Sequence, residues 1–500
     1  MMQISETDVL IIGSGLIGAA VARLVRRAEP AATILMVDAG PVIGDVAGLH
    51  LHGAPQDGSW QRYGRELQRN VIKEPEPKAF LPRALAPKAG MHFLAEFGLV
   101  ADQMPGAALS WNTGGMGVHW GAITPAPRGH EIPDCVPADL WFADLAIAES
   151  ILRVHPDPFG DFRITRLLKR RINDMHAGLS MSAEPIRPVP MALIPAPDNR
   201  LRRVGPNVIF PAMSDRSDPR FVLLPSVQVM RIDHDGRTVA GAQLRATESG
   251  SDWVVRARAT VVCAGAFRSP QLLYASGIRP AALGKFINEH AFLDSRVIVN
   301  SALLGFSLED LPAARDGEWC LGVHWLPHSG ESQPIHGLYT DMLISDSDGI
   351  ASGYAVNFTS YVPTEIKEAN KLEFSDQELD ATGMPRIRVK FAYSPRDLDL
   401  VEQARVLQFR TAARLGAFDP AVTPELMPAG SSLHITGTVR MGPENDGSSV
   451  CDPNMRVWNY DNLFIAGCGA IPTSMVSNAT LTGTVTAVRA ARAVAGLLTR

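Results

Sequence analysis

Hydrophobic and polar positions alternate along this chain in two ways, one with the period of a strand and one with the period of a helix. Residues 8–12 form a short β-branched run, residues 16–27 continue with a helical pattern, and residues 33–37 form another apolar run. This order predicts a strand, a helix and a second strand. Residues 41–133 are rich in Gly, Pro, His and Trp and show little period, so we expect mostly loops and short helices there.

Strand signals return after residue 220 and continue to residue 391. Turn residues at Asp235-Gly236 and Gly250-Ser251 separate the first group as hairpin corners do. We expect strands at 221–224, 227–232, 240–246, 253–256 and 260–263, and then at 296–299, 319–325, 337–344, 353–361 and 386–391. Because the second group follows strand upon strand, it predicts a largely antiparallel sheet.

Helical patterns flank this strand-rich region. We expect helices over 150–178, 395–415 and 481–498, a strand at 462–465, and a proline-rich linker at 185–211. The 500 residues of the chain correspond to roughly two to four domains at ordinary domain sizes.

Composition excludes several classes of protein. The chain has 47 Lys and Arg against 52 Asp and Glu, a net charge of −5, and no basic stripe, so we expect no nucleic-acid partner. Its five cysteines show neither C-x-x-C spacing nor a Cys/His cluster, which argues against a disulfide framework and a metal site. Residues 9–25 are apolar, but Glu6 and Asp8 precede them and Arg23 interrupts them. We therefore expect no signal peptide or membrane segment and predict a soluble, cytoplasmic protein.

A glycine-rich loop supplies the first candidate chemistry. Gly13-x-Gly15-x-x-Gly18 follows a predicted strand and opens a helix, and Asp38 stands 20 residues after Gly18 at the end of the next strand. The first glycine permits a tight turn, the second lets backbone amides approach a pyrophosphate, and the third allows close helix–strand packing. Asp38 is the candidate for a ribose hydroxyl. The motif predicts a dinucleotide site without separating FAD from NAD.

Residues 261–278 read VVCAGAFRSPQLLYASGI, and they decide between the two cofactors. This segment resembles the second signature of the GMC (glucose–methanol–choline) oxidoreductases, flavoproteins that oxidise alcohols, except that Arg279 replaces the final glycine. Residues 283–290, LGKFINEH, are similar to the connection of that family towards its substrate domain, and we interpret His290 as structural. The resemblance implies FAD, with Ala264 and Gly265 beside it.

The carboxyl-terminal segment resembles the pyranose oxidase branch of that family. It contains HITGTVRMG at 434–442, NLFIAGCGAIPT at 462–473 and SNATLT at 477–482, with Val439 and Ala479 as departures from the branch. The resemblance implies that His434 and Asn478 face the flavin ring together. It also places Gly469, Ala470, Asn478, Ala479 and Thr480 against the cofactor.

The chemistry of alcohol oxidation suits these two residues. A neutral imidazole, with an ordinary pKa near 6.5, can take the hydroxyl proton while hydride leaves for flavin N5. An asparagine amide can donate to the developing alkoxide and hold the substrate carbon in line. The alternatives are a core histidine for His434 and a cap of the last helix for Asn478.

Residues 114–121, GGMGVHWG, resemble the flavin-attachment loop of pyranose oxidases. Val118 and Gly121 replace two threonines of that loop, so we expect Gly115, Met116, His119 and Trp120 to contact FAD without a covalent bond from His119. Val229 fits the family position whose backbone meets adenine. Trp111, Trp120 and Trp325 are candidates for stacking on a sugar face. No metal ligand is expected.

The resemblance, which runs from residue 9 to the carboxyl terminus, implies an α/β fold with two domains. We expect a discontinuous FAD-binding, Rossmann-like domain from 1–150, 205–294 and 425–500. The remaining residues, 151–204 and 295–424, form a substrate domain on a largely antiparallel sheet covered by helices, which residues 370–385 also resemble.

The expected activity is oxidation of a secondary hydroxyl, C3 favoured, of a pyranose or a C- or O-glycoside, because the chain resembles the shorter bacterial pyranose-oxidase-like enzymes. Oxygen or a quinone would reoxidise the flavin, and the protein would be a monomer or small homo-oligomer. The alternatives are a pyranose 2-oxidase, a GMC-fold oxidase or hydroxynitrile lyase acting on another alcohol, and a noncatalytic flavin-binding protein. An NAD-dependent dehydrogenase is weaker, since the segments near 265 and 434 have no role in one.

Overall fold

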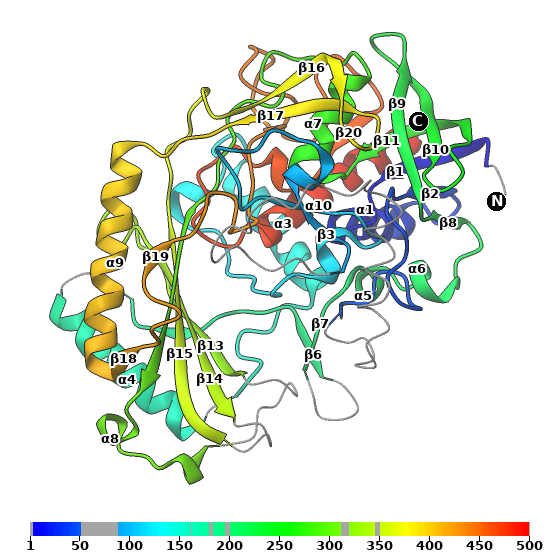
Figure 1. Cartoon of the computed structure of the whole chain (residues 1–500). Coiled ribbons are helices and arrows are strands. Elements are labelled where there is room, and N and C mark those ends of the chain that lie inside the picture. Colours follow the sequence, from blue (N-terminus) through cyan, green and yellow to red (C-terminus); the bar gives the residue numbers. More distant parts are fainter. Residues whose placement is uncertain are drawn as a thin grey trace.

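Two seven-stranded sheets form the framework of the protein. The computed structural model describes residues 4–51, 89–160, 162–179, 184–195, 201–311, 320–345 and 351–499. Figure 1 shows the first sheet at the right and the second at the lower left, with the α-helix Pro395–Leu415 (α9) along the outer side of the second.

The first sheet carries the predicted strand–helix–strand unit. Its strand order is β8-β2-β1-β11-β10-β9, and β20 also pairs with β11. Its members are β1 (Glu6–Ile12), β2 (Ile34–Val37), β8 (Phe221–Leu224), β9 (Val227–His234), β10 (Val239–Ala246), β11 (Asp252–Val262) and β20 (Leu463–Ile465). Strands β8, β2, β1, β11 and β20 run parallel, while β10 and β9 add an antiparallel edge.

The two strands expected at 253–256 and 260–263 are one continuous strand, β11, so that prediction was wrong. Residues 252–256 pair with β10, and residues 256–262 pair with β1, while Thr260–Val262 also pair with β20. The polar residues between the two apolar runs remain in the strand because β1 continues the hydrogen-bonded ladder past them.

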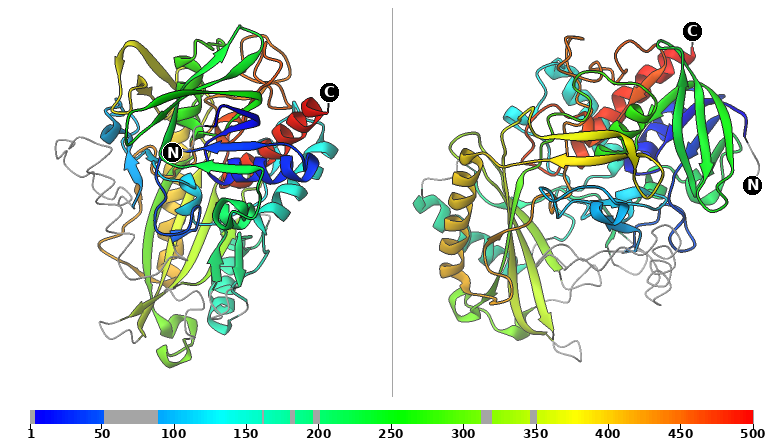
Figure 2. Two further views of the ribbon diagram at one scale, coloured as in Figure 1. Left: turned by 90° about the vertical axis from the view of Figure 1, so that its right-hand side faces the viewer. Right: turned by 45° about the horizontal axis from the view of Figure 1, so that its top comes forward.

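Helices α1 (Leu16–Ala28), α3 (Ala138–Leu152) and α10 (Thr480–Leu498) pack together against the first sheet. Figure 2 shows α10 (red) beside α1 (blue). Both helices contribute to one large apolar core with the strands, including Val21 and Val485. The carboxyl ends of the parallel strands and the amino ends of these helices therefore meet at one edge of the sheet.

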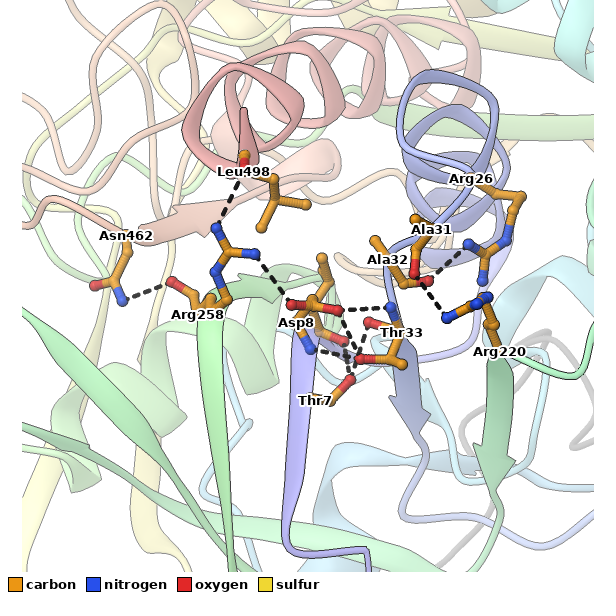
Figure 3. A network of polar contacts seen from close by, with 11 residues as sticks. Thr7, Asp8, Arg26, Ala31, Ala32, Thr33, Arg220, Arg258, Asn462 and Leu498 are labelled. Atoms are coloured by element: carbon orange, nitrogen blue, oxygen red, sulfur yellow. Dashed lines mark hydrogen bonds and ion pairs between the residues drawn. The ribbon is translucent and has the colours of Figure 1, made fainter. Parts of the chain in front are cut away.

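The opposite edge is held by a polar network, drawn in Figure 3. The Asp8 carboxylate accepts hydrogen bonds from the Thr33 amide and hydroxyl, both at 2.8 Å, and from Arg258 at 3.2 Å. Arg258 also donates to the Leu498 carbonyl at the end of α10, and Arg26 donates to the Ala32 carbonyl. These contacts tie the starts of β1 and β2 to the ends of α1 and α10.

The second sheet is antiparallel throughout, as predicted. Its order is β18-β12-β15-β14-β13-β5, with β19 also on β12. Its strands are β5 (Arg187–Pro188), β12 (Ala291–Val299), β13 (Cys320–Leu326), β14 (His336–Ser345), β15 (Ala351–Val362), β18 (Gly416–Phe418) and β19 (Glu425–Leu426). Helices α4 (Arg163–Leu179) and α9 share an apolar cluster with this sheet through Leu168, Leu407 and Phe358.

The prediction of one helix over 150–178 was wrong, because the chain is not helical in the middle of this range. Helix α3 ends at Leu152, where Arg153 adopts a positive φ of 52°, and α4 begins only at Arg163. Pro156 and Pro158 lie in the intervening segment, and proline lacks the amide that would continue a helix. The helix expected over 395–415 coincides with α9.

The remaining elements are short, which agrees with the expectation for the described parts of 41–133. Residues 52–88 of that segment lie outside the described residues, and so does Trp319, the first residue of the strand expected at 319–325. Residues 370–391 were expected to belong to the antiparallel sheet of the substrate domain, and this was wrong. Residues 371–379 and 385–390 form a separate two-stranded sheet that packs on the helix at 265–275. The short elements are β3 (Met91–Phe93), η2 (Leu94–Phe97), β4 (Ala108–Ser110), η3 (Gly115–Val118), η4 (Gly129–Glu131), β6 (Leu193–Pro195), β7 (Leu201–Arg203), α5 (Pro206–Ile209), α6 (Ala212–Asp215), α7 (Gly265–Ala275), α8 (Ser301–Leu304), η5 (Leu308–Asp310), β16 (Lys371–Leu379), β17 (Pro385–Lys390) and η6 (Cys468–Ala470).

Residues 185–211, expected as a linker, contain β5, β6, β7 and α5. None of the helices in the described ranges combines the length and the apolar character needed to cross a bilayer.

Candidate active site

The three glycines of the phosphate loop differ in whether the surrounding protein leaves room for a side chain. Gly13 has φ +105°, and a Cβ there would lie 2.5 Å from the Cys263 carbonyl oxygen. A Cβ on Gly18 would lie 2.0 Å from the Gly13 carbonyl oxygen. Gly15 differs, because it has φ −63° and a Cβ there would meet no described protein atom within 3.8 Å. The protein itself therefore needs glycine at Gly13 and Gly18, whereas a Cβ at Gly15 would make only an ordinary van der Waals contact with the Gly114 carbonyl oxygen.

Asp38 lies at the end of β2, as predicted, and its carboxylate binds the loop. Oδ2 accepts from the Ser14 amide at 3.0 Å and the Ser14 hydroxyl at 2.6 Å, and Oδ1 accepts from the Gly40 amide at 3.0 Å. Burial raises the pKa of Asp38, while these hydrogen bonds oppose the rise. Asp38 thus shapes the loop as well as facing the cavity beside it.

A cavity extends from the phosphate loop to the carboxyl-terminal motifs. Ser14, Gln228, Arg268, Cys263 and Cys468 line it although the sequence did not single them out as contacts. The expected site residues that line it are Gly13, Gly15, Asp38, Gly115, Met116, Trp120, Val229, Ala264, Gly265, His434 and Thr480. Chain segments more than 400 residues apart in sequence therefore share one wall.

The other expected residues are not among the described residues that line the cavity; they are Gly18, His119, Gly469, Ala470, Asn478 and Ala479. His119 is buried, and its Nε2 lies 2.9 Å from the Asn112 Oδ1. Gly469 and Ala470 accept backbone hydrogen bonds from Val439 and Met441. These two residues thus attach the 434–442 segment to the turn after β20.

A chain of polar side chains starts at His434, on the cavity wall. The Asn478 Nδ2 lies 3.4 Å from the His434 Nε2, and the His434 Nδ1 lies 2.9 Å from the His290 Nε2. The His290 Nδ1 lies 3.3 Å from the Met475 carbonyl oxygen. The structure therefore brings the two predicted catalytic residues together and adds His290, which we had interpreted as structural.

One set of proton positions satisfies every contact in this chain. A carbonyl only accepts, so His290 donates from Nδ1 to Met475 and accepts at Nε2. His434 then donates from Nδ1, which leaves its Nε2 as an acceptor lone pair beside the Asn478 amide. A neutral His434 with an unprotonated Nε2 is the form that a general base requires.

The electrostatics of the cluster favour this neutral form. Burial lowers the pKa of His434 to about 4, and burial together with the neighbouring histidines lowers the pKa of His290 well below its usual value. Tyr361 packs against both rings: its ring centroid lies 4.4 Å from that of His290 and 5.8 Å from that of His434. Burial raises the pKa of Tyr361. The surroundings thus hold a base that is unprotonated at neutral pH.

A buried carboxyl group, that of Glu289, holds the loop before His434 by hydrogen bonds. Glu289 accepts from the Gly430 amide at 2.5 Å and from the Ser432 amide and hydroxyl at 3.1 and 2.6 Å. Burial raises the pKa of Glu289 to about 7. Leu433 has a positive φ of 59°, a conformation that is costly for a leucine. Because Glu289 binds Gly430 and Ser432 in this turn, it fixes the backbone that sets the direction of the His434 side chain.

Comparison with known proteins agrees with this geometry. Two sequence models of GMC oxidoreductases match residues 204–292 and 367–487. A C-glycoside 3-oxidase from Microbacterium trichothecenolyticum is 31% identical over 99% of this chain and 98% of its own. The chain belongs to the GMC oxidoreductase family.

Other relatives extend the picture. A C-glycoside 3-oxidase from Arthrobacter globiformis is 32% identical over 99% of this chain and 96% of its own. A pyranose 2-oxidase from Tricholoma matsutake is 26% identical over 79% of this chain and 74% of its own. The solved structure of a pyridoxine 4-oxidase from Mesorbium loti, 16% identical, shares the fold with a TM-score of 0.59 and covers 97% of this chain and 98% of its own.

GMC oxidoreductases depend on FAD, and the cavity has features that fit this cofactor. Gly15, the residue before α1, lines the cavity at the amino terminus of that helix. The α10 amino terminus, at Thr480, also opens on the cavity, and its cap residue Ala479 supplies no side-chain hydrogen bond. Arg268, which lines the cavity, has a buried Nε and Nη2 that no acceptor in the described ranges satisfies. Each feature supplies N–H groups for an anionic or polar ligand.

Sequence reasoning missed residues whose partners are distant in the chain. Glu289 stands next to His290 in the segment singled out at 283–290, but its partners at 430–432 are about 140 residues away. The capping role considered for Asn478 is excluded, because the cap of α10 is Ala479. Trp111 and Trp120 line the cavity, whereas Trp325 lies beside His336, with 5.3 Å between ring centroids.

The loop glycines generate a paired prediction. Gly15→Ala should lower FAD affinity at least tenfold while leaving the thermal unfolding of the apoprotein nearly unchanged, because its Cβ would make only an ordinary van der Waals contact with the Gly114 carbonyl oxygen and would otherwise occupy the approach of the ligand. Gly18→Ala should destabilise the apoprotein itself, because its Cβ would collide with the Gly13 carbonyl. Flavin titration and scanning calorimetry of both apoproteins measure this difference. Equal destabilisation of both would contradict it.

Proposed function

We propose that this GMC oxidoreductase oxidises a secondary hydroxyl, C3 favoured, of a pyranose sugar or of a C- or O-glycoside to the keto sugar. The observation that carries the proposal is the Asn478–His434–His290 chain at the wall of the dinucleotide cavity. The full-length likeness to two C-glycoside 3-oxidases supports the substrate class.

The side chains divide the work of alcohol oxidation. FAD, when bound, supplies the hydride acceptor. The His434 Nε2 takes the hydroxyl proton, and the Asn478 amide donates to the alkoxide oxygen as the C–H bond breaks. The His290 Nε2 accepts from the His434 Nδ1 and keeps the imidazole in this tautomer as its charge develops.

Buried polar atoms near His434 support a polar substrate. His336 is fully buried, both of its ring nitrogens lack a hydrogen-bond partner in the described part of the chain, and its ring lies 5.5 Å from the Tyr361 ring. Burial lowers the pKa of His336 to about 3, so its ring is neutral with one donor and one acceptor. Sugar hydroxyls offer both complementary groups.

The cofactor is bound without a covalent link in this proposal. His119, the residue at the position of the family's attachment histidine, directs Nε2 to Asn112 and is not among the described residues that line the cavity. Val118 and Gly121 stand where the attachment loop has threonines. FAD would thus depend on the phosphate loop, Asp38 and the α10 amino terminus.

We further propose that residues 1–150, 205–294 and 425–500 form the FAD-binding domain and that residues 151–204 and 295–424 form the substrate domain. In support, the first sheet draws all its strands from the former ranges. The second sheet draws its strands from the latter ranges except at two boundaries, where β12 begins at Ala291 and β19 covers Glu425–Leu426. Oxygen or a quinone is the proposed electron acceptor. The proposed oligomeric state is a monomer or a small homo-oligomer. The cytoplasmic location remains a prediction from the sequence.

A pyranose 2-oxidase is the second candidate, favoured by the likeness to the pyranose 2-oxidase of Tricholoma matsutake. The same His434 and Asn478 would serve either position of attack, so the two functions differ in how the sugar lies on the flavin. Product analysis separates them.

Substrate reduction of the flavin is the primary test. Anaerobic mixing with free sugars and with C- and O-glycosides should bleach the flavin absorbance near 450 nm, glycosides most rapidly, and yield a 3-keto product. In His434→Ala the rate should fall about 10²- to 10⁴-fold, the usual contribution of a general base. A flavin that dithionite reduces but no sugar bleaches would reject the sugar assignment and bring a lyase or another alcohol forward.

The pH dependence should reflect the low pKa of His434. The protonated, inactive imidazole accumulates only as pH falls through about 4, so His434 itself should contribute no inflection to the rate of flavin reduction between pH 5 and 8. An inflection near 7 that disappears in Glu289→Gln belongs to Glu289, whose pKa is about 7. An inflection near 6.5 that persists in this variant would show that His434 titrates as an ordinary histidine and contradict the assignment.

Cofactor attachment has a direct measurement. Acid precipitation of the purified protein should release all FAD into the supernatant, because only hydrogen bonds and packing hold it. Yellow colour that stays with the precipitate, together with a flavin-bearing peptide containing His119, would show covalent attachment. Substitution of His119 by Ala distinguishes the two, since colour retained in that variant points to a different residue.

A further inference from the structure

Glu131, at the end of η4, is a completely buried carboxylate outside every motif singled out in the sequence. Its Oε1 accepts from the backbone amides of Val476 and Ser477, at 2.7 and 2.6 Å. Its Oε2 accepts from the Ser477 hydroxyl at 3.0 Å and from the His328 Nε2 at 2.8 Å. The amide of Arg128 also donates to Oε2, at 2.8 Å.

These donors explain how a buried carboxylate stays charged. Burial alone would raise the pKa of Glu131, but the bond from His328 and the backbone amides lower it to about 2. A carboxylate that accepts several N–H groups is stabilised in its ionised form. Glu131 is thus an anion with its lone pairs filled by protein donors.

The partners of Glu131 converge on the segment before Asn478. Val476 and Ser477 are the two residues that precede it, and the Thr473 hydroxyl donates to the Glu131 carbonyl at 2.9 Å. The Asn478 Oδ1 is buried and has no hydrogen-bond partner among the described residues, and the Asn478 Nδ2 lies 3.4 Å from the His434 Nε2. The backbone of 476–477 therefore determines where the Asn478 amide lies.

We propose that Glu131 is a positioning residue for the oxidation, which fixes the Asn478 amide against His434 by binding the backbone of 476–477. The inference rests on the proposed function for the reaction that it serves. Through His328, on the loop between β13 and β14, the same carboxylate also attaches this segment to the antiparallel sheet. Three parts of the chain thus meet at one anion.

Glu131→Gln tests the proposal at nearly constant volume. The glutamine amide keeps one acceptor oxygen, but its NH₂ group replaces the other oxygen and faces N–H or O–H donors that it cannot accept. The 476–477 segment should therefore become less firmly held. Amide hydrogen exchange in a peptide covering 474–479 should accelerate, while exchange over 428–436 stays unchanged. Glu289→Gln is the matched control, because its carboxylate holds Gly430 and Ser432 and the pattern should reverse.

Kinetics distinguish positioning from general damage. Flavin reduction in Glu131→Gln should slow about 10- to 100-fold, as misplaced catalytic groups do, with the dissociation constant of the sugar and the flavin spectrum little changed. In an Asn478→Ala background the same substitution should have almost no further effect, because the group it positions is gone.

Two results would overturn the proposal. One is a slowing by Glu131→Gln that is as large in Asn478→Ala as in the wild type, and the other is unchanged exchange over 474–479. If Glu131→Gln does not fold, Ser477→Ala removes a single donor to Oε2 and should show the same pattern more weakly. The exchange readout needs no substrate, so it decides the anchoring even where no sugar reduces the wild-type flavin.

Discussion

Buried carboxylates that accept backbone N–H groups are the interaction on which the active site depends. Glu289 holds the turn before His434, and Glu131 holds the segment before Asn478. Each carboxyl group sits where solvent cannot compete, so its hydrogen bonds are strong and their geometry is restricted. The two side chains that meet at 3.4 Å are therefore positioned through their backbones as well as by the contacts of their own polar atoms.

Electrostatics and geometry act together in this arrangement. Burial keeps the pKa of His434 near 4, and the chain through His290 to the Met475 carbonyl orients the lone pair of its Nε2. Low dielectric surroundings strengthen each of these contacts and penalise any polar group without a partner. The cluster is consequently committed to one tautomer before a substrate arrives.

Sequence patterns predicted those features that depend on near neighbours. The phosphate loop, helix α9 and the hairpin turns follow from spacing and turn residues within short windows. The patterns failed where distant partners decide, as in β11, which continues between its apolar runs because β1 pairs alongside. Glu131 and its partners at 476–477 are about 345 residues apart, and no local signal connects them.

The pairing of β1 with β11 has a consequence for how the protein is made. Gly13 and Cys263 lie within contact distance, and Thr480 at the start of the last helix completes the same cavity. A ribosome must therefore synthesise the chain at least as far as Thr480 before the cofactor site exists. Flavin loading is a late event, and until then the emerging parallel strands lack the partner edges that protect them from other nascent chains.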